Sequence, residues 1–398
     1  MTMGSRRLAS VDAIRALTML LMIFVNDLVS LKDVPSWLEH AGEMEDRMGL
    51  ADVVFPAFLF IVGLSIPFAI ANRQAKGYSR KSTLIHILLR SFALLVMGIY
   101  NVNYENYVKE GGIIPKFWWL LLATIAFFLV WLDYPREMKR GRKRAMQWAG
   151  ILILVFLAIV YRGQERGHVI WMKPHWYGIL GLIGWCYLIC ACLYLWTKGR
   201  QQVLWISFFF FIGLCIADKA GMLVMLKPLR NFFWIVGSGS LPSLTMGGVL
   251  VAMIYRQGVD KGKAVQSLWI LMAFAMLATV AGFGLRPYWG ISKLRSTPAW
   301  ILISMGIGIA VFVLLAWLMD VKGHKSWYKL IRPAGTSTLT CYLLPNIHFA
   351  ICHILGEQCR LPEFLRTDGI GIAKSAIYAF LIVLLTGWLE KKKTRLAI

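Results

Sequence analysis

The residues best suited to chemistry in this chain lie near its start. His40 lies in a polar segment between two apolar runs, Asn26 closes the first run and Asp52 opens the second. An imidazole titrates near neutral pH, so His40 can accept a proton or act as a nucleophile. A carboxylate can orient the ring, and an amide can donate a hydrogen bond to a developing oxyanion. We predict that His40, Asn26 and Asp52 form a catalytic site, although His40 alone is also typical of a solvated loop and Asp52 of a helix N-cap.

The elements around these residues are apolar enough to lie in a membrane. The 398 residues are 58% hydrophobic and 16% charged, and the mean hydropathy is +0.63. Crossing a hydrocarbon core takes roughly 20 apolar residues per helix, and the sequence supplies such runs repeatedly. We predict an all-α polytopic membrane protein, a bundle of about 10–12 transmembrane helices in one domain over residues 1–398, with its catalytic core at about 10–71. The twelve expected spans are 12–31, 51–71, 82–100, 116–133, 147–161, 176–196, 202–217, 241–256, 266–284, 299–320, 335–355 and 370–389.

Basic residues set the predicted orientation. They concentrate on one side of the predicted spans, above all in the run at 136–144 and in the tail at 390–395. Lys and Arg favour cytoplasmic loops, so we expect both termini to be cytoplasmic and His40 to lie on the opposite side. The net charge of +23 then reflects this topology and contact with anionic lipid headgroups, rather than binding to nucleic acid. The first apolar run is long and lacks a cleavage site of small residues, so we interpret it as a span and not as a signal peptide.

A second polar group lies at the cytoplasmic start of the first span. Asp12 and Arg15 are three residues apart there and face the same side of a helix. Their spacing is typical of an ion pair at the membrane edge. It fits equally well a contact to a cytoplasmic ligand.

Aromatic and basic residues mark two loops on the side of His40. The loop at 168–178 and the loop at 285–300 both combine Trp and Tyr with Lys or Arg. One interpretation is an aromatic belt at the membrane interface. The other is a cleft in which aromatic faces stack on sugar rings and cations pair with acidic groups. Under the second interpretation the substrate-binding residues are Asp27, Trp176, Arg286, Trp289 and Lys293.

The cysteines predict neither a disulfide framework nor a metal site. Most of the seven lie within predicted spans, where cysteine behaves as a small hydrophobe. No CxxC motif or Cys/His ligand spacing is present apart from the weak group of His348, Cys352 and His353. We therefore expect no metal.

Three motifs make the first two spans distinctive. They are RLASVDAIRALTMLLMIFVND at 7–27, His40-Ala41, and GLADVVFPAFLFIVGLSI at 49–66. Together they resemble the catalytic region of the heparan-α-glucosaminide N-acetyltransferase family. Further similar segments are 179–188, 240–250 and 319–342, so that the resemblance covers most of the chain.

The resemblance implies a transmembrane acetyltransferase that takes acetyl groups from cytoplasmic acetyl-CoA and delivers them to a sugar or glycan across the membrane. His40 would be the base or a transient acyl carrier, Asp52 its orienting carboxylate, and Asn26 a donor to the acyl oxygen. A bacterial relative of this kind would lie in the inner membrane, and a homodimer is a further expectation. The residues expected to bind acetyl-CoA are Asp12, Arg15, Lys322, Ser337 and Tyr342.

The sequence also departs from the family pattern. Ala16 replaces a glycine, residues 335–338 read GTST where the family has an asparagine, and a pair of spans at about 116–161 is interpreted as an insertion. Two other functions compete with N-acetylation of a sugar. One is O-acylation of cell-envelope glycans, and the other is a transporter or flippase for a sugar or lipid.

Overall fold

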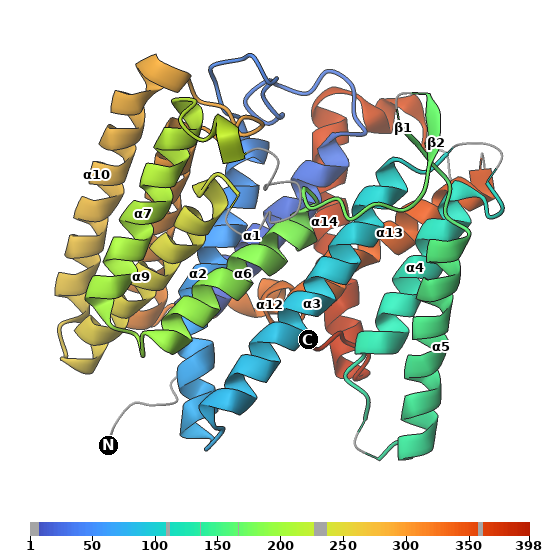
Figure 1. Ribbon diagram of the computed structural model, residues 1–398, viewed down its shortest axis with the longest axis horizontal. Helices are drawn as coiled ribbons and strands as arrows, with labels where there is room; N and C mark the ends of the chain where they lie inside the picture. The colour runs from blue at the N-terminus through green and yellow to red at the C-terminus, as the bar shows by residue number, and fades with distance from the viewer. Residues whose placement is uncertain (1–7, 109–111, 136, 166, 227–236, 357–360) are drawn as a thin grey trace.

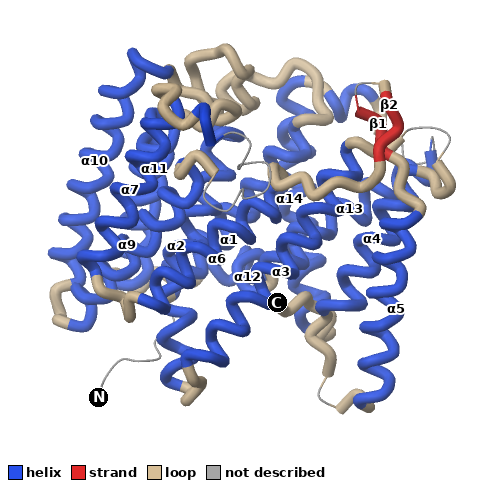
Figure 2. Tube along the Cα trace, in the orientation of Figure 1, coloured by secondary structure: helices blue, strands red, loops and turns tan. Residues whose placement is uncertain are grey.

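The computed structural model describes residues 8–108, 112–135, 137–165, 167–226, 237–356 and 361–398. The regular structure in these residues is helical, apart from a small antiparallel hairpin of β1 (Gly163–Glu165) and β2 (His168–Ile170), as Figure 2 shows. The predicted all-α polytopic fold is confirmed. The helices of the bundle are α1 (Ala9–Leu28), α2 (Leu50–Ala75), α3 (Arg80–Glu105), α4 (Lys116–Trp131), α5 (Arg140–Ile159), α6 (Ile179–Trp196), α7 (Gln201–Lys219), α9 (Ser240–Asp260), α10 (Ala264–Trp289), α11 (Pro298–Ala316), α12 (Tyr328–Thr336), α13 (Thr338–Leu355) and α14 (Asp368–Lys391).

Each of the twelve predicted spans contains one of these helices. In the described part of the chain, nine helices are long and apolar enough to cross a membrane by themselves. The other three of the twelve predicted spans correspond to α4, α5 and α9. Helix α4 has only 16 residues, α5 starts with a basic segment, and α9 is buried without interruption from Ser240 to Met253. A helix surrounded by other helices does not need an apolar surface toward lipid, which explains the polar residues of α9.

One predicted span is not a single helix. The expected span 335–355 crosses a break at Ser337, whose φ of −125° and ψ of 46° separate α12 from α13. Hydroxyl side chains gather at this break, and Thr338 Oγ1 donates to the carbonyl of Gly335 at 3.2 Å. Such local bonds compete with helical hydrogen bonds, so α12 ends at Thr336 and α13 begins at Thr338.

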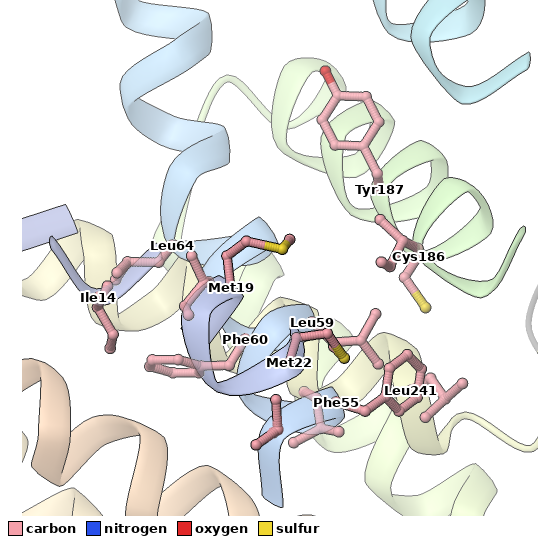
Figure 3. Packing of buried hydrophobic residues seen from close by; sticks show 14 of the residues in the cluster. Ile14, Met19, Met22, Phe55, Leu59, Phe60, Leu64, Cys186, Tyr187 and Leu241 are labelled. Atoms are coloured by element: carbon pink, nitrogen blue, oxygen red, sulfur yellow. The ribbon is translucent and has the colours of Figure 1, made fainter. Parts of the chain in front are cut away.

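The centre of the bundle is formed by α1, α2, α6 and α9, with α10 and α11 packed together on one side and α4 and α5 on the other (Figure 1). Figure 3 shows side chains of α1, α2, α6 and α9, including Met19, Phe60 and Cys186, packed in this core. The backbones of α2 and α9 approach very closely. A Cβ atom on Gly63 would lie 1.8 Å from the carbonyl oxygen of Thr245, and one on Gly248 would lie 2.0 Å from that of Phe60. Small residues are what permits such an approach between membrane helices.

Two loops meet at one end of the bundle. The loop between α1 and α2 (29–49) and the loop between α10 and α11 (290–297) both lie at the top of Figure 1, whereas the turn between α2 and α3 lies at the bottom. The hydroxyl of Ser292 donates to the carbonyl of Glu43 at 3.3 Å and joins the two loops. The first loop carries His40, and the start of α2 carries Asp52.

Candidate active site

Asp52 is fixed at the start of α2 by its side chain and its backbone. One carboxylate oxygen, Oδ2, accepts hydrogen bonds from the backbone N–H of Ala41 at 2.9 Å and of Gly49 at 3.2 Å. The indole N–H of Trp300, from α11, donates to the backbone carbonyl of Asp52 at 3.0 Å. The side chain of Asp52 is only 2% exposed. Its position is therefore set before any ligand binds.

The second carboxylate oxygen of Asp52 contacts the imidazole of His40. Nδ1 of His40 lies 2.8 Å from Oδ1 of Asp52, and the His40 side chain is 41% exposed. A buried carboxylate on one ring nitrogen leaves Nε2 available to a substrate, which is the arrangement of a histidine base and its orienting acid. The structure thus brings together the predicted pair of His40 and Asp52.

Lys293 also belongs to this site. Its Nζ lies 3.2 Å from Nδ1 of His40 and 3.9 Å from Oδ1 of Asp52. Burial lowers the pKa of Lys293 below its ordinary value, and the charge of Asp52 opposes this shift. Lys293, which the sequence predicts to bind substrate, thus lies against His40, and its contact with substrate stays a prediction.

Asp46, which was not among the predicted site residues, holds the two loops together. Oδ2 of Asp46 accepts a hydrogen bond from Nε of Arg286 at 2.8 Å, and Oδ1 accepts one from the backbone N–H of Ile291 at 2.6 Å. The bond from Arg286 is the main reason why the pKa of Asp46 lies below its ordinary value. The one signal in the sequence was the excess of acidic residues around His40, which does not distinguish Asp46 from its neighbours. Arg286, predicted to bind substrate, is thus engaged by Asp46.

Among the described residues, neither Asn26 nor Asp27 forms a hydrogen bond or ion pair with His40. Asn26 is exposed on α1, and its side chain makes no hydrogen bond to the residues that the structure describes. Oδ2 of Asp27 accepts bonds from Lys374 at 2.5 Å and Ser375 at 2.6 Å, both on α14. Asp27 therefore joins two helices, and the catalytic role of Asn26 stays a prediction.

The two predicted tryptophans have structural contacts. Trp176 packs edge-on against Trp185, with ring centroids 5.4 Å apart. The indole of Trp289 donates to the backbone carbonyl of Lys219 at 3.2 Å. A role for either ring in binding a sugar stays a prediction.

A large cavity enters the bundle from the end opposite to His40. It has a volume of about 1160 Å³, and Asp12, Arg15, Ser337 and Tyr342 line it, four of the five residues predicted to bind acetyl-CoA. Arg15 is held there by bonds to the hydroxyl of Ser65 at 2.6 Å and to the carbonyl of Gly335 at 3.3 Å. The fifth, Lys322, is not among the lining residues and lies over the ring of Trp317, 5.4 Å from its centroid.

Charged side chains of both signs, with more cations than carboxylates, and unpaired hydrogen-bonding groups line the cavity. The hydroxyl of Ser337 and Nε of Arg90 are buried and have no hydrogen-bond partner in the described residues. Both residues line the cavity, so their polar groups are available to a ligand. The other charged lining residues, besides Asp12, Arg15 and Arg90, are Arg256, Asp260, Asp320, Lys325 and Arg395.

The cavity extends along α2 toward the catalytic pair. Of the residues of α2 that line the cavity, Phe58 is nearest to Asp52 in sequence, whereas His40 and Asp52 do not line it. Phe58 and Asp52 are six residues apart on one helix, which corresponds to about 9 Å along its axis. The cavity and the His40–Asp52 pair are thus neighbours within the bundle.

No cluster of three or more histidine, cysteine, aspartate or glutamate side chains that could hold a metal ion is present in the described ranges. His348 contacts Cys352 and Tyr378, at 3.4 Å and 3.1 Å, and His353 stacks on Phe117. The side chains of His348, Cys352 and His353 therefore contact one another or neighbouring helices through hydrogen bonds and ring stacking.

Comparison with known proteins gives one family and two curated relatives. Residues 7–221, more than half of the chain, match the family model described as "Domain of unknown function (DUF5009)". The chain is 31% identical over 144 residues to "Heparan-alpha-glucosaminide N-acetyltransferase" of Mus musculus, and 38% identical over 102 residues to the protein of that name from Homo sapiens. The matched parts are 33% and 25% of this chain, and they span only 21% and 14% of the relatives. The predicted relationship to these acetyltransferases is confirmed, over part of each chain.

Proposed function

The chain belongs to the family described as "Domain of unknown function (DUF5009)", and from this membership, its curated relatives and the His40–Asp52 pair we propose that it is a multi-pass membrane acyltransferase. It moves an acetyl group from acetyl-CoA to an amino or hydroxyl group of a sugar or glycan. Its partners are this acceptor and the bilayer, and its location is the inner membrane of a bacterium. The observation that carries the proposal is the 2.8 Å contact between His40 Nδ1 and the buried carboxylate of Asp52.

The site supports a balanced transfer reaction. The nitrogen or oxygen of the acceptor bonds to the acetyl carbonyl carbon while Nε2 of His40 takes the acceptor's proton. The carbon–sulfur bond breaks, and the leaving thiolate receives that proton from His40. Asp52 keeps the ring in position and stabilises the imidazolium that forms. In a second route Nε2 of His40 bonds to the acetyl carbonyl carbon as the carbon–sulfur bond breaks and the thiolate leaves. The acceptor's nitrogen or oxygen then bonds to that carbon as the carbon–Nε2 bond breaks, and the freed Nε2 takes the acceptor's proton and passes it to the thiolate.

The cavity at the opposite end suits acetyl-CoA as the donor. Its volume of about 1160 Å³ accommodates a large ligand. The arginines and lysine that line it can pair with phosphate groups, and the Ser337 hydroxyl and Arg90 Nε offer additional hydrogen bonds. When bound, acetyl-CoA supplies the thioester; the residues of the chain hold its charged end and position its acyl end.

The separation of cavity and histidine supports transfer across the membrane. We propose that the cavity opens to the cytoplasm, as the basic segments at 136–144 and 390–395 predict. His40 then lies on the far side, with the acceptor. An extended arm needs to pass only the short stretch of α2 from Phe58 to Asp52, so the acetyl group crosses without its carrier.

Replacing His40 tests this function directly. We expect His40→Gln to lower acetyl transfer from labelled acetyl-CoA to glucosamine by about 10²–10⁴-fold, because the base is lost. His353→Gln is the matched control, since His353 stacks on Phe117 outside this site and its loss should leave the rate unchanged. Full turnover by purified His40→Gln would reject the proposal. Mild alkali distinguishes the product bonds, because it cleaves esters and leaves amides intact.

The cavity also favours one competing function. A deep polar cavity that opens at one end of a helix bundle suits a transporter as well as a transferase. Uptake of a sugar into proteoliposomes, together with no change in thermal stability on adding CoA, would support transport. An increase in thermal stability with CoA would support the transferase.

A further inference from the structure

The contacts of one ring nitrogen in the site are chemically incompatible with each other. Nδ1 of His40 lies 2.8 Å from Oδ1 of Asp52 and 3.2 Å from Nζ of Lys293. A ring nitrogen carries either a proton or an accepting lone pair. An ionised carboxylate only accepts hydrogen bonds, and an ammonium group only donates them. Asp52 and a charged Lys293 therefore require opposite states of the same nitrogen.

We propose that Lys293 is a positioning residue that determines which ring nitrogen of His40 carries the proton. For its catalytic consequence this inference rests on the proposed function. When the ammonium of Lys293 donates to Nδ1, the ring proton lies on Nε2 and His40 cannot act as a base there. When Lys293 is neutral, Nδ1–H donates to Asp52 and Nε2 presents its lone pair to the acceptor.

The surroundings of Lys293 favour loss of its proton. Its side chain is 23% exposed and that of Asp52 is 2% exposed. Burial lowers the pKa of Lys293, and the charge of Asp52 opposes this shift without reversing it. A lysine in such a position releases its proton at a lower pH than a solvated lysine does.

Two other charged side chains near the site, those of Arg286 and Arg295, act on Asp46. Arg286 of α10 donates to Asp46 of the 29–49 loop, and Arg295 of the 290–297 loop acts on the same carboxylate. Among the described residues, the charged or titratable groups that contact Lys293 are Asp52 from α2 and His40 from the 29–49 loop. A change in the charge of Lys293 therefore acts on whether Nδ1 of His40 carries a proton.

The ¹⁵N NMR signals of the His40 ring measure this proton directly. The full chain, labelled with ¹⁵N-histidine and placed in nanodiscs, is compared with His40→Gln to assign the signals. As the pH rises toward the titration of Lys293, we expect the ring proton of the wild type to move from Nε2 to Nδ1. In Lys293→Met it should stay on Nδ1 wherever the ring is neutral, because the competing donor is gone. If Lys293→Met shows the same tautomers as the wild type at every pH, the inference is wrong.

The pH profile of acetyl transfer provides a second readout. The wild-type rate should rise with the titration of Lys293, and Lys293→Met should lose this rise. Lys293→Arg keeps a permanent donor at Nδ1. At alkaline pH its rate of acetyl transfer should therefore be at least about tenfold lower than that of the wild type. The upper limit is the ~10⁴-fold loss that a wrong histidine tautomer causes. Lys173→Met, which removes a lysine paired with Glu165 at 2.8 Å, should keep the wild-type profile.

The two readouts separate this inference from the proposed function. The NMR signals do not require turnover, so a wild type without acetyl transfer but with the expected tautomers would reject the function and retain the role of Lys293. Transfer that depends on His40, with a pH profile unchanged in Lys293→Met, would reject the role of Lys293 alone.

Discussion

At the scale of residues, Asp52 has two roles, although the N-cap position of α2 that the sequence suggested for it belongs to Gly49, and Asp52 lies three residues further on. Its Oδ2 accepts backbone bonds from Ala41 and Gly49 and so caps α2, while its Oδ1 contacts the imidazole of His40. Because each oxygen has its own partners, the helix cap also orients the ring. A short acidic side chain at the start of α2 is sufficient for both tasks.

Asp46 gives a prediction about pH. The bond from Arg286 is the largest of the effects that hold the pKa of Asp46 below its ordinary value of 3.8. A group with a lower pKa in the folded protein adds stability above its unfolded pKa, and this stability is lost as the pH falls through the folded value. The wild type should therefore melt at a higher temperature than Asp46→Asn well above pH 3.8, by a small margin because the pair is half-exposed.

The same comparison at acid pH decides whether this assignment is correct. The difference in melting temperature between wild type and Asp46→Asn should shrink as the pH falls below 3.8. A difference that persists unchanged in acid would mean that Asp46 stabilises the loops without its charge.

At the scale of elements, the site depends on contacts between segments that are far apart in the sequence. The 29–49 loop and the 290–297 loop meet through Asp46 and Ile291, and Trp300 of α11 supports the start of α2. The position of α2 itself is set by α9, whose backbone it touches at Gly63 and Gly248. Packing in the middle of the bundle therefore determines where Asp52 lies.

Gly63 offers a test of this packing. A Cβ atom there would lie 1.8 Å from the carbonyl oxygen of Thr245, so Gly63→Ala must push α2 from α9. We expect a loss of about 1–3 kcal/mol in the free energy of unfolding, seen as a lower melting temperature. Gly213→Ala is the matched control, because α7 has open space at Gly213. An equal effect of both substitutions would show that the α2–α9 contact is not responsible.

At the scale of the whole molecule, the apolar runs predicted the fold well. All twelve expected spans contain a helix, since length and hydropathy are local properties of the chain. The break at Ser337 was missed, because the expected span 335–355 included the last two residues of the polar helix α12 together with the apolar helix α13. The interpretation of 116–161 as an inserted pair stays a prediction; α4 and α5 lie in this range, at one side of the bundle (Figure 1).

The site was predictable where its residues are close in sequence. His40 and Asp52 are twelve positions apart, and motifs around them resemble a known family. Lys293 comes from a loop some 250 positions later, and no local pattern indicates that it contacts His40. The sequence does not distinguish Asp46 from the other acidic residues around His40. That Asn26 has no hydrogen-bond partner in the described residues is visible only in the structure.

Transfer of an acetyl group across the membrane is the central claim, and sealed proteoliposomes test it most directly. Acetyl-CoA is supplied outside only and glucosamine is enclosed inside only, with protein-free liposomes to measure leakage. The account predicts acetylated glucosamine inside vesicles that carry the wild type, and a rate lower by about 10²–10⁴-fold with His40→Gln. Product that forms only when both substrates share one side of the membrane, or that forms equally well without His40, would contradict it.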